Sequence, residues 1–409
     1  MFKRILIVAV LASTILPGVA VTASTNDQPS STLTVHEWGT FTSVAGVDGK
    51  AEAWLPLGGP NDLPCFVDYY QNRLYKDIGP VAVNTQRNAI DYNKARAALL
   101  GPIRMETPVL YFYAPKRQKV SIRVAFPEGF ITEWYPKATV NQTPVRTAAL
   151  EKPTKTGATI SWNSVEVLPP NASAIFPRST GSSHYYAARN TDANPVRVGA
   201  YDEKFLFYRG VGGFPVPMNV TVAPNGKVAI KHLSGKPSVI LFENRGGKIG
   251  YTVVDTKQNE VLLDSPALTG SFDALRDELQ SVLVGQGLYA REAQAMIDTW
   301  RDSWFEEGTR IFYIVPTTMV DTILPLSIQP TPKEVARVFV GRIEVFTPKT
   351  VQAVEEAVAA NDATIVGKYG RFLGPIMERI PYAKRGSNNA TMLNAAFNSY
   401  IQQASSCSK

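Results

Sequence analysis

One predicted strand, Val35-His36-Glu37-Trp38-Gly39-Thr40-Phe41-Thr42, has two chemically different faces. Successive side chains of a strand point to opposite faces of the sheet. Glu37 therefore shares one face with the apolar Val35 and Phe41, whereas His36 shares the other face with an indole and two hydroxyl groups. A strand that only filled a core would need neither arrangement, so this segment predicts a functional or tightly paired polar group within a sheet.

His36 and Glu37 are the first candidate catalytic residues. As neighbours on a strand they point in opposite directions, so they cannot bind one metal ion together unless a bulge intervenes. His36 would act as a general acid, a general base or a ligand; the alternative is a hydrogen-bonded structural histidine beside Trp38. The alternative for Glu37 is a buried carboxylate paired with an arginine, because burying it unpaired costs several kcal/mol. Trp38 is a candidate substrate-binding residue.

The N-terminus has the order of a secretory signal peptide. Lys3-Arg4 precede an apolar run over 5–16, and small residues follow the break at Pro17-Gly18. The sequence therefore predicts a signal peptide over 1–23, a polar spacer over 24–32 and an extracytoplasmic mature protein, either periplasmic or secreted. An uncleaved membrane anchor is the alternative, although the run is short for a membrane-spanning helix. No transmembrane segment is expected after removal of the leader.

Length and composition indicate a large globular protein. A chain of 409 residues favours two domains or one large, elaborated domain. Charged residues make up 19% of the chain, and it has 29 glycines and 29 prolines, which is typical of a lightly charged, turn-rich protein. The net charge is +7, but the basic residues are scattered and form no run, so no nucleic-acid partner is expected.

The segment 33–268 has the pattern of a β-rich domain. Residues 119–126 alternate between apolar and polar side chains, and similar short runs recur between turns. Asn225-Gly226 and Gly246-Gly247 predict two hairpins, because these residues accept the positive φ of tight turns. Short strands at this spacing predict an antiparallel β-sandwich-like N-terminal part.

The segment 269–409 is predicted to be a mainly helical region packed on the β-rich domain, so the fold class is α+β. Apolar residues recur at helical spacing after residue 271 and again in 293–304. Thr331-Pro332-Lys333-Glu334 has the pattern of a capping box, so the β-branched run 335–346 is predicted to be a helix. Further helices are predicted over 348–360, 369–380 and 389–402.

Two glutamates follow the helix predicted over 293–304. Glu306-Glu307 lie at a helix C-terminus, where the helix dipole disfavours each carboxylate by about 0.3–1 kcal/mol. Locally unfavourable residues are frequent at functional sites, so Glu306 is a candidate catalytic residue. The alternative is that Arg301, Arg310 or a distant arginine neutralises the pair.

His184 lies in a predicted loop shortly before Arg189. Together with His36 and a carboxylate such as Glu106, His184 would supply ligands that suit a metal ion. However, no HExxH, Cys-x-x-Cys or Asp-rich loop accompanies them. The sequence therefore leaves the metal content and the cofactors open, and His184 stays a candidate acid or base.

Aromatic residues next to charged ones supply the remaining candidates. Two carboxylates flanked by aromatic rings suit the recognition and acid–base cleavage of a sugar. Trp134, Arg189 and Arg209 are therefore candidate substrate-binding residues, and Glu106 is a candidate acid or base. The alternative for each is a core aromatic cluster with a salt bridge.

Several common motifs are absent. There is no Gly-x-Ser-x-Gly nucleophile elbow and no phosphate-binding P-loop. The glycine-rich run 209–213 precedes Phe-Pro-Val-Pro and not a helix, which excludes a dinucleotide site. The only cysteines are Cys65 and Cys407; they would pair in an oxidising compartment, or stay unpaired if the C-terminal tail is loose.

Five specific stretches resemble an uncharacterised family of secreted bacterial proteins. The resemblance spans most of the mature chain and implies an exported bacterial protein, but no activity and no functional residues. The stretches are His36-Glu-Trp-Gly-Thr-Phe-Thr42, Met105-Glu-Thr-Pro-Val-Leu-Tyr-Phe-Tyr113, Thr132-Glu-Trp-Tyr-Pro136, Glu203-Lys-Phe-Leu-Phe-Tyr-Arg-Gly210 and Thr299-Trp-Arg-Asp-Ser-Trp-Phe-Glu-Glu307.

These observations lead to two hypotheses about function. The first is a binding or structural module of the cell envelope, whose partner would be an envelope glycan or peptide. The second is a hydrolase that acts on a glycan or peptide by carboxylate and histidine acid–base chemistry. An enzyme requires its acidic and imidazole groups around one pocket, whereas a binding module can leave them in separate salt bridges.

Overall fold

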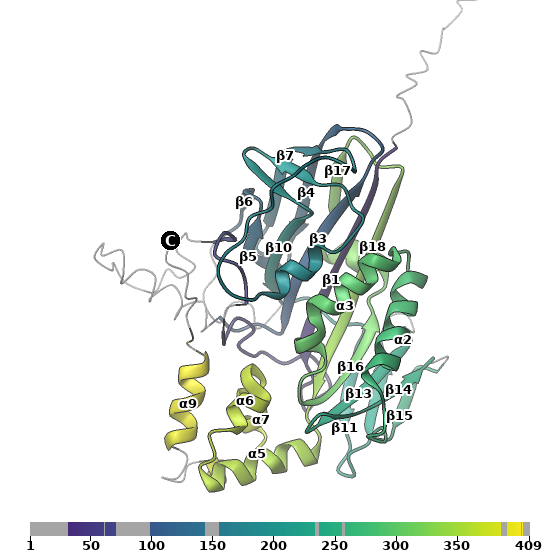
Figure 1. The fold of residues 1–409 in the computed structure, drawn as a ribbon. Coiled ribbons are helices and arrows are strands. Elements are labelled where there is room, and N and C mark those ends of the chain that lie inside the picture. The colour runs from purple at the N-terminus through teal and green to yellow at the C-terminus, as the bar shows by residue number, and fades with distance from the viewer. Residues whose placement is uncertain are drawn as a thin grey trace, which may run out of the picture.

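The computed structural model describes residues 32–60, 62–70, 99–143, 155–233, 237–255, 258–385, 391–401 and 403. The predicted signal peptide over 1–23 lies outside the described residues, and so do Cys407 and all of the predicted spacer over 24–32 except residue 32. The described chain is a mixed α/β protein with large sheets, and most of its helices come late in the sequence (Figure 1).

The largest sheet has nine strands in the order β14-β13-β16-β18-β1-β3-β10-β5-β2. The predicted two-faced segment is the central strand β1, which pairs with β18 in parallel and with β3 in antiparallel fashion. The strands are β1 (Thr34–Val44), β2 (Asp68–Tyr69), β3 (Ile103–Tyr113), β5 (Gly129–Tyr135), β10 (Leu206–Gly212), β13 (Val239–Arg245), β14 (Lys248–Val254), β16 (Gly308–Ile314) and β18 (Glu334–Val345).

Strand β18 corrects the prediction of a helix over 335–346. Its β-branched residues lie buried between β1 and β16, where such side chains pack well on a pleated surface. This tertiary pairing overrides the local capping-box pattern at 331–334. The parallel β1–β18 pair also corrects the expectation of purely antiparallel strands, and the nine-stranded sheet crosses the boundary expected at residue 268.

Two smaller sheets complete the β structure. The predicted alternation in 119–126 and the hairpins at Asn225-Gly226 and Gly246-Gly247 are confirmed by β4, β11–β12 and β13–β14. The six-stranded sheet contains β17 (Leu326–Gln329), β4 (Gln118–Phe126), β7 (Ala158–Val167), β8 (Val196–Val198), β9 (Tyr201–Glu203) and β6 (Thr139–Asn141), and the three-stranded sheet contains β11 (Met218–Val222), β12 (Val228–His232) and β15 (Glu260–Leu263).

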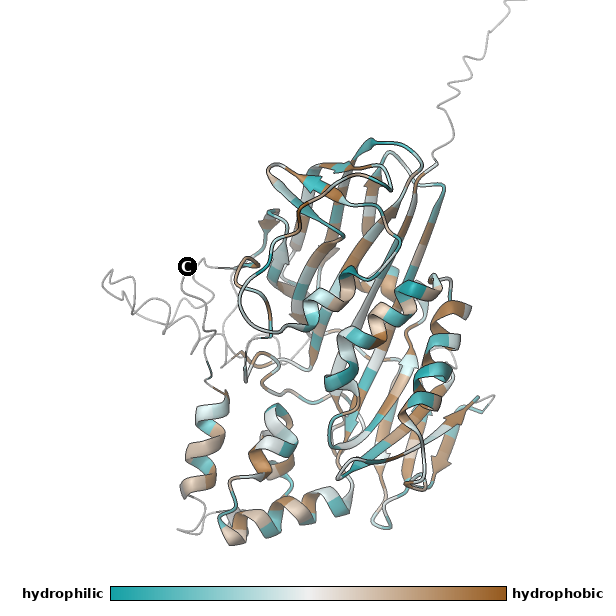
Figure 2. Ribbon diagram, viewed as in Figure 1, coloured by the Kyte–Doolittle hydropathy of each residue, from teal (hydrophilic) through white to brown (hydrophobic). Residues whose placement is uncertain are grey.

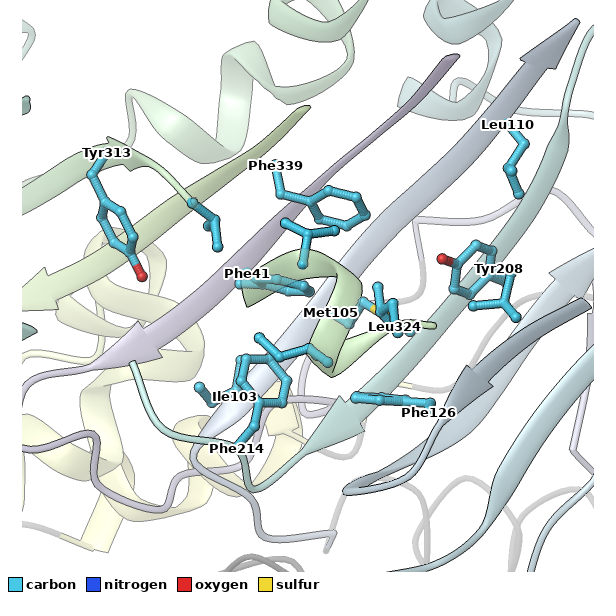
Figure 3. Close-up of a cluster of buried hydrophobic side chains, with 14 of the residues drawn as sticks. Phe41, Ile103, Met105, Leu110, Phe126, Tyr208, Phe214, Tyr313, Leu324 and Phe339 are labelled. Carbon is cyan, nitrogen blue, oxygen red and sulfur yellow. The ribbon is translucent and has the colours of Figure 1, made fainter. Parts of the chain in front are cut away.

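One face of the nine-stranded sheet shares a hydrophobic core with both smaller sheets. This face carries Val35 and Phe41 of β1, as the alternation predicts, and Phe41 stacks on Phe339 of β18 with ring centroids 4.9 Å apart (Figure 3). Leu324 follows the short helix α4 (Thr317–Ile323) and reaches the same core.

The opposite face is covered by α2 (Phe272–Gly285), α3 (Ala290–Trp304) and the 3-10 helix η1 (His184–Arg189). Trp38 of β1 packs there against the apolar side of α3. The helices carry both hydrophobic and hydrophilic residues in Figure 2, which is typical of amphipathic helices that cover a sheet. The predicted helices after residue 271 and over 293–304 are confirmed.

The late helices gather around Trp54 and the ends of β1 and β18. The helix predicted over 369–380 is interrupted, because Gly370 has a φ of 47° and begins a separate 3-10 turn. These helices are α5 (Pro348–Ala360), α6 (Ile365–Tyr369), η2 (Gly370–Phe372), α7 (Leu373–Glu378), α8 (Tyr382–Arg385) and α9 (Thr391–Ile401). In the part of the chain that the structure describes, no helix has the length and apolar character needed to cross a membrane.

Candidate functional site

His36 is buried in a contact between β1 and the start of α3. Its Nδ1 donates to Oε2 of Glu292 at 2.6 Å, and the two side chains are 1% and 0% exposed. The rings of Tyr113 and Tyr289 lie 5.2 and 4.6 Å from the imidazole centroid. Glu292 also accepts from the backbone N–H of Tyr289, so the contact fixes the N-terminus of α3 on the sheet. This geometry favours the structural alternative for His36.

Glu37 is fully buried on the other face and is paired, as the arginine alternative predicts. The hydroxyl of Tyr208 donates to Oε1 at 2.6 Å, and Nε of Arg337 donates to Oε2 at 2.7 Å. Arg337 also bonds Asp321 at 2.7 Å. Both carboxylate oxygens are therefore used, and Glu37 holds β1, β10 and β18 together without a free group for catalysis.

The structure does not bring His36, His184 and Glu106 together. His184 lies at the surface near the end of α3, with its Nε2 3.7 Å from Oδ2 of Asp302. Glu106 pairs with Thr40, four residues along β1 from His36, which is about 13 Å. The described residues contain no group of three metal-ligating side chains. The shared acid–base or metal centre that the hydrolase hypothesis needs is thus not assembled from these residues.

Three predicted substrate-binding residues have packing roles. Arg189 donates to both oxygens of the buried Glu203 at 2.8 and 2.6 Å, within a shell of aromatic rings. Trp38 is fully buried, and its assignment to substrate contact stays a prediction. Trp134 is half-buried and packs against the main core. The fourth predicted substrate-binding residue, Arg209, differs from these three because it belongs to a cluster of buried charged side chains that also contains Glu106.

Arg209 lies in a buried charged cluster on the lower part of the α3-covered face. Strand register aligns its members: Thr42 of β1 lies opposite Arg104 of β3 and opposite Arg342 of β18, while Thr40 lies opposite Glu106. We call this set the arginine cluster; it consists of Arg104, Glu106, Arg209 and Arg342 on the sheet, with Asp62 and Arg371 from the covering segments.

A bulge in β3 shapes this cluster. One extra residue of β3 is accommodated against both neighbouring strands, and Thr107 there adopts a φ of 47°. This left-handed conformation is strained for a β-branched residue, and such strain is concentrated at functional sites. Gly39 of β1 permits the bulge, because a Cβ at that position would lie 2.8 Å from the ring of Phe339 and 3.1 Å from Cα of Pro108.

Most charges of the cluster are well paired. Arg209 forms a two-pronged ion pair with Asp62 at 2.8 and 2.9 Å, and its Nε donates to Thr107. Arg371 of η2 donates to Glu106 at 2.9 Å. Two-pronged and buried pairs of this kind hold the loop around Asp62 and the late helices against the sheet.

Arg104 is the exception. Its side chain is only 8% exposed, yet its Nε has no hydrogen-bond partner among the described residues. The nearest carboxylate oxygen, on Glu106, is 4.0 Å away. The hydroxyl groups of Thr40 and Thr42 are also buried without a partner there. Three unused polar groups therefore face the same part of the sheet.

The pKa values follow this uneven pairing. The pKa of Arg104 is lowered to about 9, chiefly by burial, with smaller contributions from the neighbouring cations Arg371 and Arg209 that Glu106 and Asp62 oppose. Burial raises the pKa of Glu106, but Arg371 and Arg104 outweigh it and hold the value at about 2. The Glu106 carboxylate is therefore ionised, and burial, more than its charged neighbours, disfavours the Arg104 cation.

Glu306 borders the cluster from the end of α3. Its Oε1 accepts from Arg342 at 2.5 Å, while Arg310 donates to the backbone carbonyls of Trp304, Glu306 and Glu307. A distant arginine thus neutralises Glu306, whereas Oε2 of Glu307 accepts from the backbone N–H of Gly246 at 2.8 Å. The backbone carbonyls at the helix C-terminus are satisfied by Arg310.

Sequence reasoning missed Arg104, Asp62, Arg342 and Arg371 as members of a site. The local signal was the pair of hydroxyl groups, Thr40 and Thr42, that shares a face of the strand with His36 and Trp38. Cys65 is disulfide-bonded, and the other cysteine of the sequence lies outside the described residues.

Comparisons of the chain with protein families, curated proteins and solved structures give no match. The resemblance to a family of secreted bacterial proteins therefore stays a prediction.

Proposed function

We propose that the protein is an exported bacterial binding module of the cell envelope, and that its arginine cluster binds a carboxylate or phosphate group of an envelope glycan or peptide. The observation that carries the proposal is that, among the described residues, Nε of Arg104 and the neighbouring hydroxyls of Thr40 and Thr42 have no hydrogen-bond partner. The N-terminal leader pattern and the family resemblance support export to the periplasm or the exterior.

Energetics support an anionic ligand. A buried donor without an acceptor costs about 1–3 kcal/mol, which a ligand oxygen would recover. A guanidinium binds carboxylate and phosphate oxygens through charge-assisted hydrogen bonds, and the two threonine hydroxyls can donate to the same group. The local excess of positive charge at Arg104 favours an anion over a neutral ligand.

The surrounding architecture supports a rigid site. Arg104, Glu106 and the threonines lie on central strands, so their backbones are fixed by pairing on both sides. The six-stranded sheet supports this platform from behind as one layer of a sandwich-like arrangement. A site on strands is held more precisely than one on loops.

Isothermal titration calorimetry on the mature chain tests the proposal. Phosphate, glucuronate and a peptide with a free C-terminal carboxylate are compared with uncharged glucose and an amidated peptide. We expect saturable binding of at least one anion, and Arg104→Met to weaken it about tenfold or more. Arg123→Met is the matched control, because Arg123 is exposed on β4. Equal affinities of Arg104→Met and Arg123→Met for the anion, or no anion binding at all, would contradict the proposal.

The pH dependence gives a second readout. An anion needs the protonated guanidinium, and the pKa of Arg104 is about 9 in the ligand-free protein. Affinity for a ligand that stays ionised is therefore expected to fall as the pH rises through 9, and an affinity that stays constant to pH 10 would argue against Arg104 as the anchor.

A further inference from the structure

A second candidate site lies between α2 and α3, which pack side by side over the sheet (Figure 1). A pocket of about 370 Å³ opens between the beginning of α2 and the end of α3. Its lining residues follow helical spacing: Phe272 and Arg276 from α2, and Ile297, Arg301 and Phe305 at or just after α3. The volume is within the range of small-ligand pockets.

The base of the pocket is apolar. Phe272 keeps 42% of its surface exposed, although its ring packs against Phe305 with centroids 5.8 Å apart. Ile297 and Phe305 are buried in the core beneath α3. An exposed aromatic ring beside buried apolar groups offers a surface on which an apolar ligand side chain loses contact with water.

The edge of the pocket carries both signs of charge. Arg276 and Arg301 pair with the exposed neighbours Asp273 and Asp302 at 2.8 and 3.5 Å. Such exposed pairs contribute little stability, so a ligand can compete for either partner at small cost. Glu306, the remaining charged residue that lines the pocket, is already held by Arg342.

We propose that this pocket binds a short peptide with free termini and apolar side chains. The peptide carboxylate would bind Arg301 and Arg276, its ammonium group would bind Asp302, and its side chains would pack on Phe272 and Ile297. Opposite charges on one edge of an apolar base fit a zwitterion better than a ligand with a single sign of charge. The proposal does not rest on the arginine cluster, because none of these five residues belongs to that cluster.

Calorimetry with the dipeptide Leu-Phe on the full mature chain tests this inference. We expect saturable binding, and binding of acetyl-Leu-Phe-amide weaker by about tenfold or more, because its termini carry no charge. Arg301→Gln is expected to cause a similar loss. Arg291→Gln is the matched control, since Arg291 is an exposed arginine of the same helix that pairs with Asp192 away from the pocket.

Three outcomes would overturn the inference: no saturable binding of Leu-Phe, equal binding of the free and blocked dipeptides, or equal losses in Arg301→Gln and Arg291→Gln. If Arg104→Met abolished Leu-Phe binding and Arg301→Gln retained it, the dipeptide would bind at the arginine cluster and not in this pocket. That result would also overturn the inference. Failure of anion binding in the cluster leaves these measurements unaffected. A circular dichroism melt of each variant verifies that exposed substitutions keep the fold.

Discussion

Glu37 and Glu106 are buried glutamates on the adjacent central strands β1 and β3, and each lies beside an arginine. Around Glu37, both carboxylate oxygens are used and Arg337 extends the chain of bonds to Asp321. Around Glu106, Arg371 is bound but Arg104 keeps an unused Nε. Among the described residues Arg337 also keeps one guanidinium nitrogen, Nη2, without a hydrogen bond, so an incompletely paired buried arginine does not by itself distinguish the two regions. What distinguishes the Glu106 region is that the hydroxyl groups of Thr40 and Thr42, on the strand opposite Glu106 and Arg104, also lack a hydrogen-bond partner there.

The two glutamates also differ in what covers them. Glu37 faces the core shared by three sheets, where apolar side chains fill the space. Glu106 faces the loop of Asp62 and the η2 turn of Arg371, which come from separate parts of the chain. The first environment is therefore enclosed by packed sheets, whereas segments from separate parts of the chain cover the second.

The largest expected effect is on the stability of the protein when Glu37, whose carboxylate oxygens are both hydrogen-bonded, is replaced. Glu37→Leu removes the carboxylate and leaves Arg337 and the Tyr208 hydroxyl buried without it, which should lower the free energy of unfolding by about 3–5 kcal/mol. Urea denaturation measures the change. Glu166→Leu is the control, because the Glu166–Arg117 pair lies at the surface. Its effect should stay below about 1 kcal/mol, and a Glu37→Leu effect as small as this would refute a structural role.

The second-largest effect is a loss of folding stability at low pH, caused by protonation of Glu106. The pKa of Glu106 is lowered from 4.5 to about 2 in the folded protein, so the unfolded state binds more protons between these values. The resulting stability is fully present above pH 4.5 and is lost as the pH falls through 2, and it amounts to about 3 kcal/mol. Urea midpoints between pH 5 and 2 measure it. Glu106→Gln should flatten this dependence; an unchanged profile would show that other carboxylates cause it.

A smaller effect is expected at the bulge that separates the two environments. Gly39→Ala adds a Cβ against the Phe339 ring and the backbone of Pro108, so it should destabilise the protein by about 1–3 kcal/mol. Thermal unfolding and anion titration together distinguish its consequences. A displaced bulge should weaken anion binding as well. Gly285→Ala is a control for glycine replacement, because no atom lies within 4 Å of a Cβ there and its φ is not positive.

The smallest effect on stability is expected at Thr42. Its hydroxyl has no partner among the described residues, so Thr42→Val should change the free energy of unfolding by less than about 1 kcal/mol and can stabilise the protein. Anion affinity should nevertheless fall, because the ligand loses a donor. Denaturation and calorimetry on the same sample test both statements. A large destabilisation would mean that the hydroxyl already has a structural partner, and the site would lose one of its three unused groups.

The burial and pairing of Glu37 were partly predictable from the local sequence. The alternation in 35–42 predicts that Glu37 enters the core and that an arginine must accompany it, because an unpaired buried carboxylate is too costly. It does not predict which arginine, since Arg337 is 300 residues away. The Glu106 environment was less accessible, because the Thr107 bulge, Asp62 and Arg371 meet only in the folded chain.

The sequence by itself determined the two faces of β1, the Asn225-Gly226 and Gly246-Gly247 hairpins and the amphipathic helices α2 and α3. Each depends on side-chain periodicity or turn chemistry within a few residues, which a local segment contains completely. Only the tertiary structure decided that β18 (Glu334–Val345) is a strand parallel to β1 and that Nε of Arg104 has no hydrogen-bond partner among the described residues. Strand pairing and charge compensation depend on which distant segments meet, and that choice is made by the packing of the whole chain.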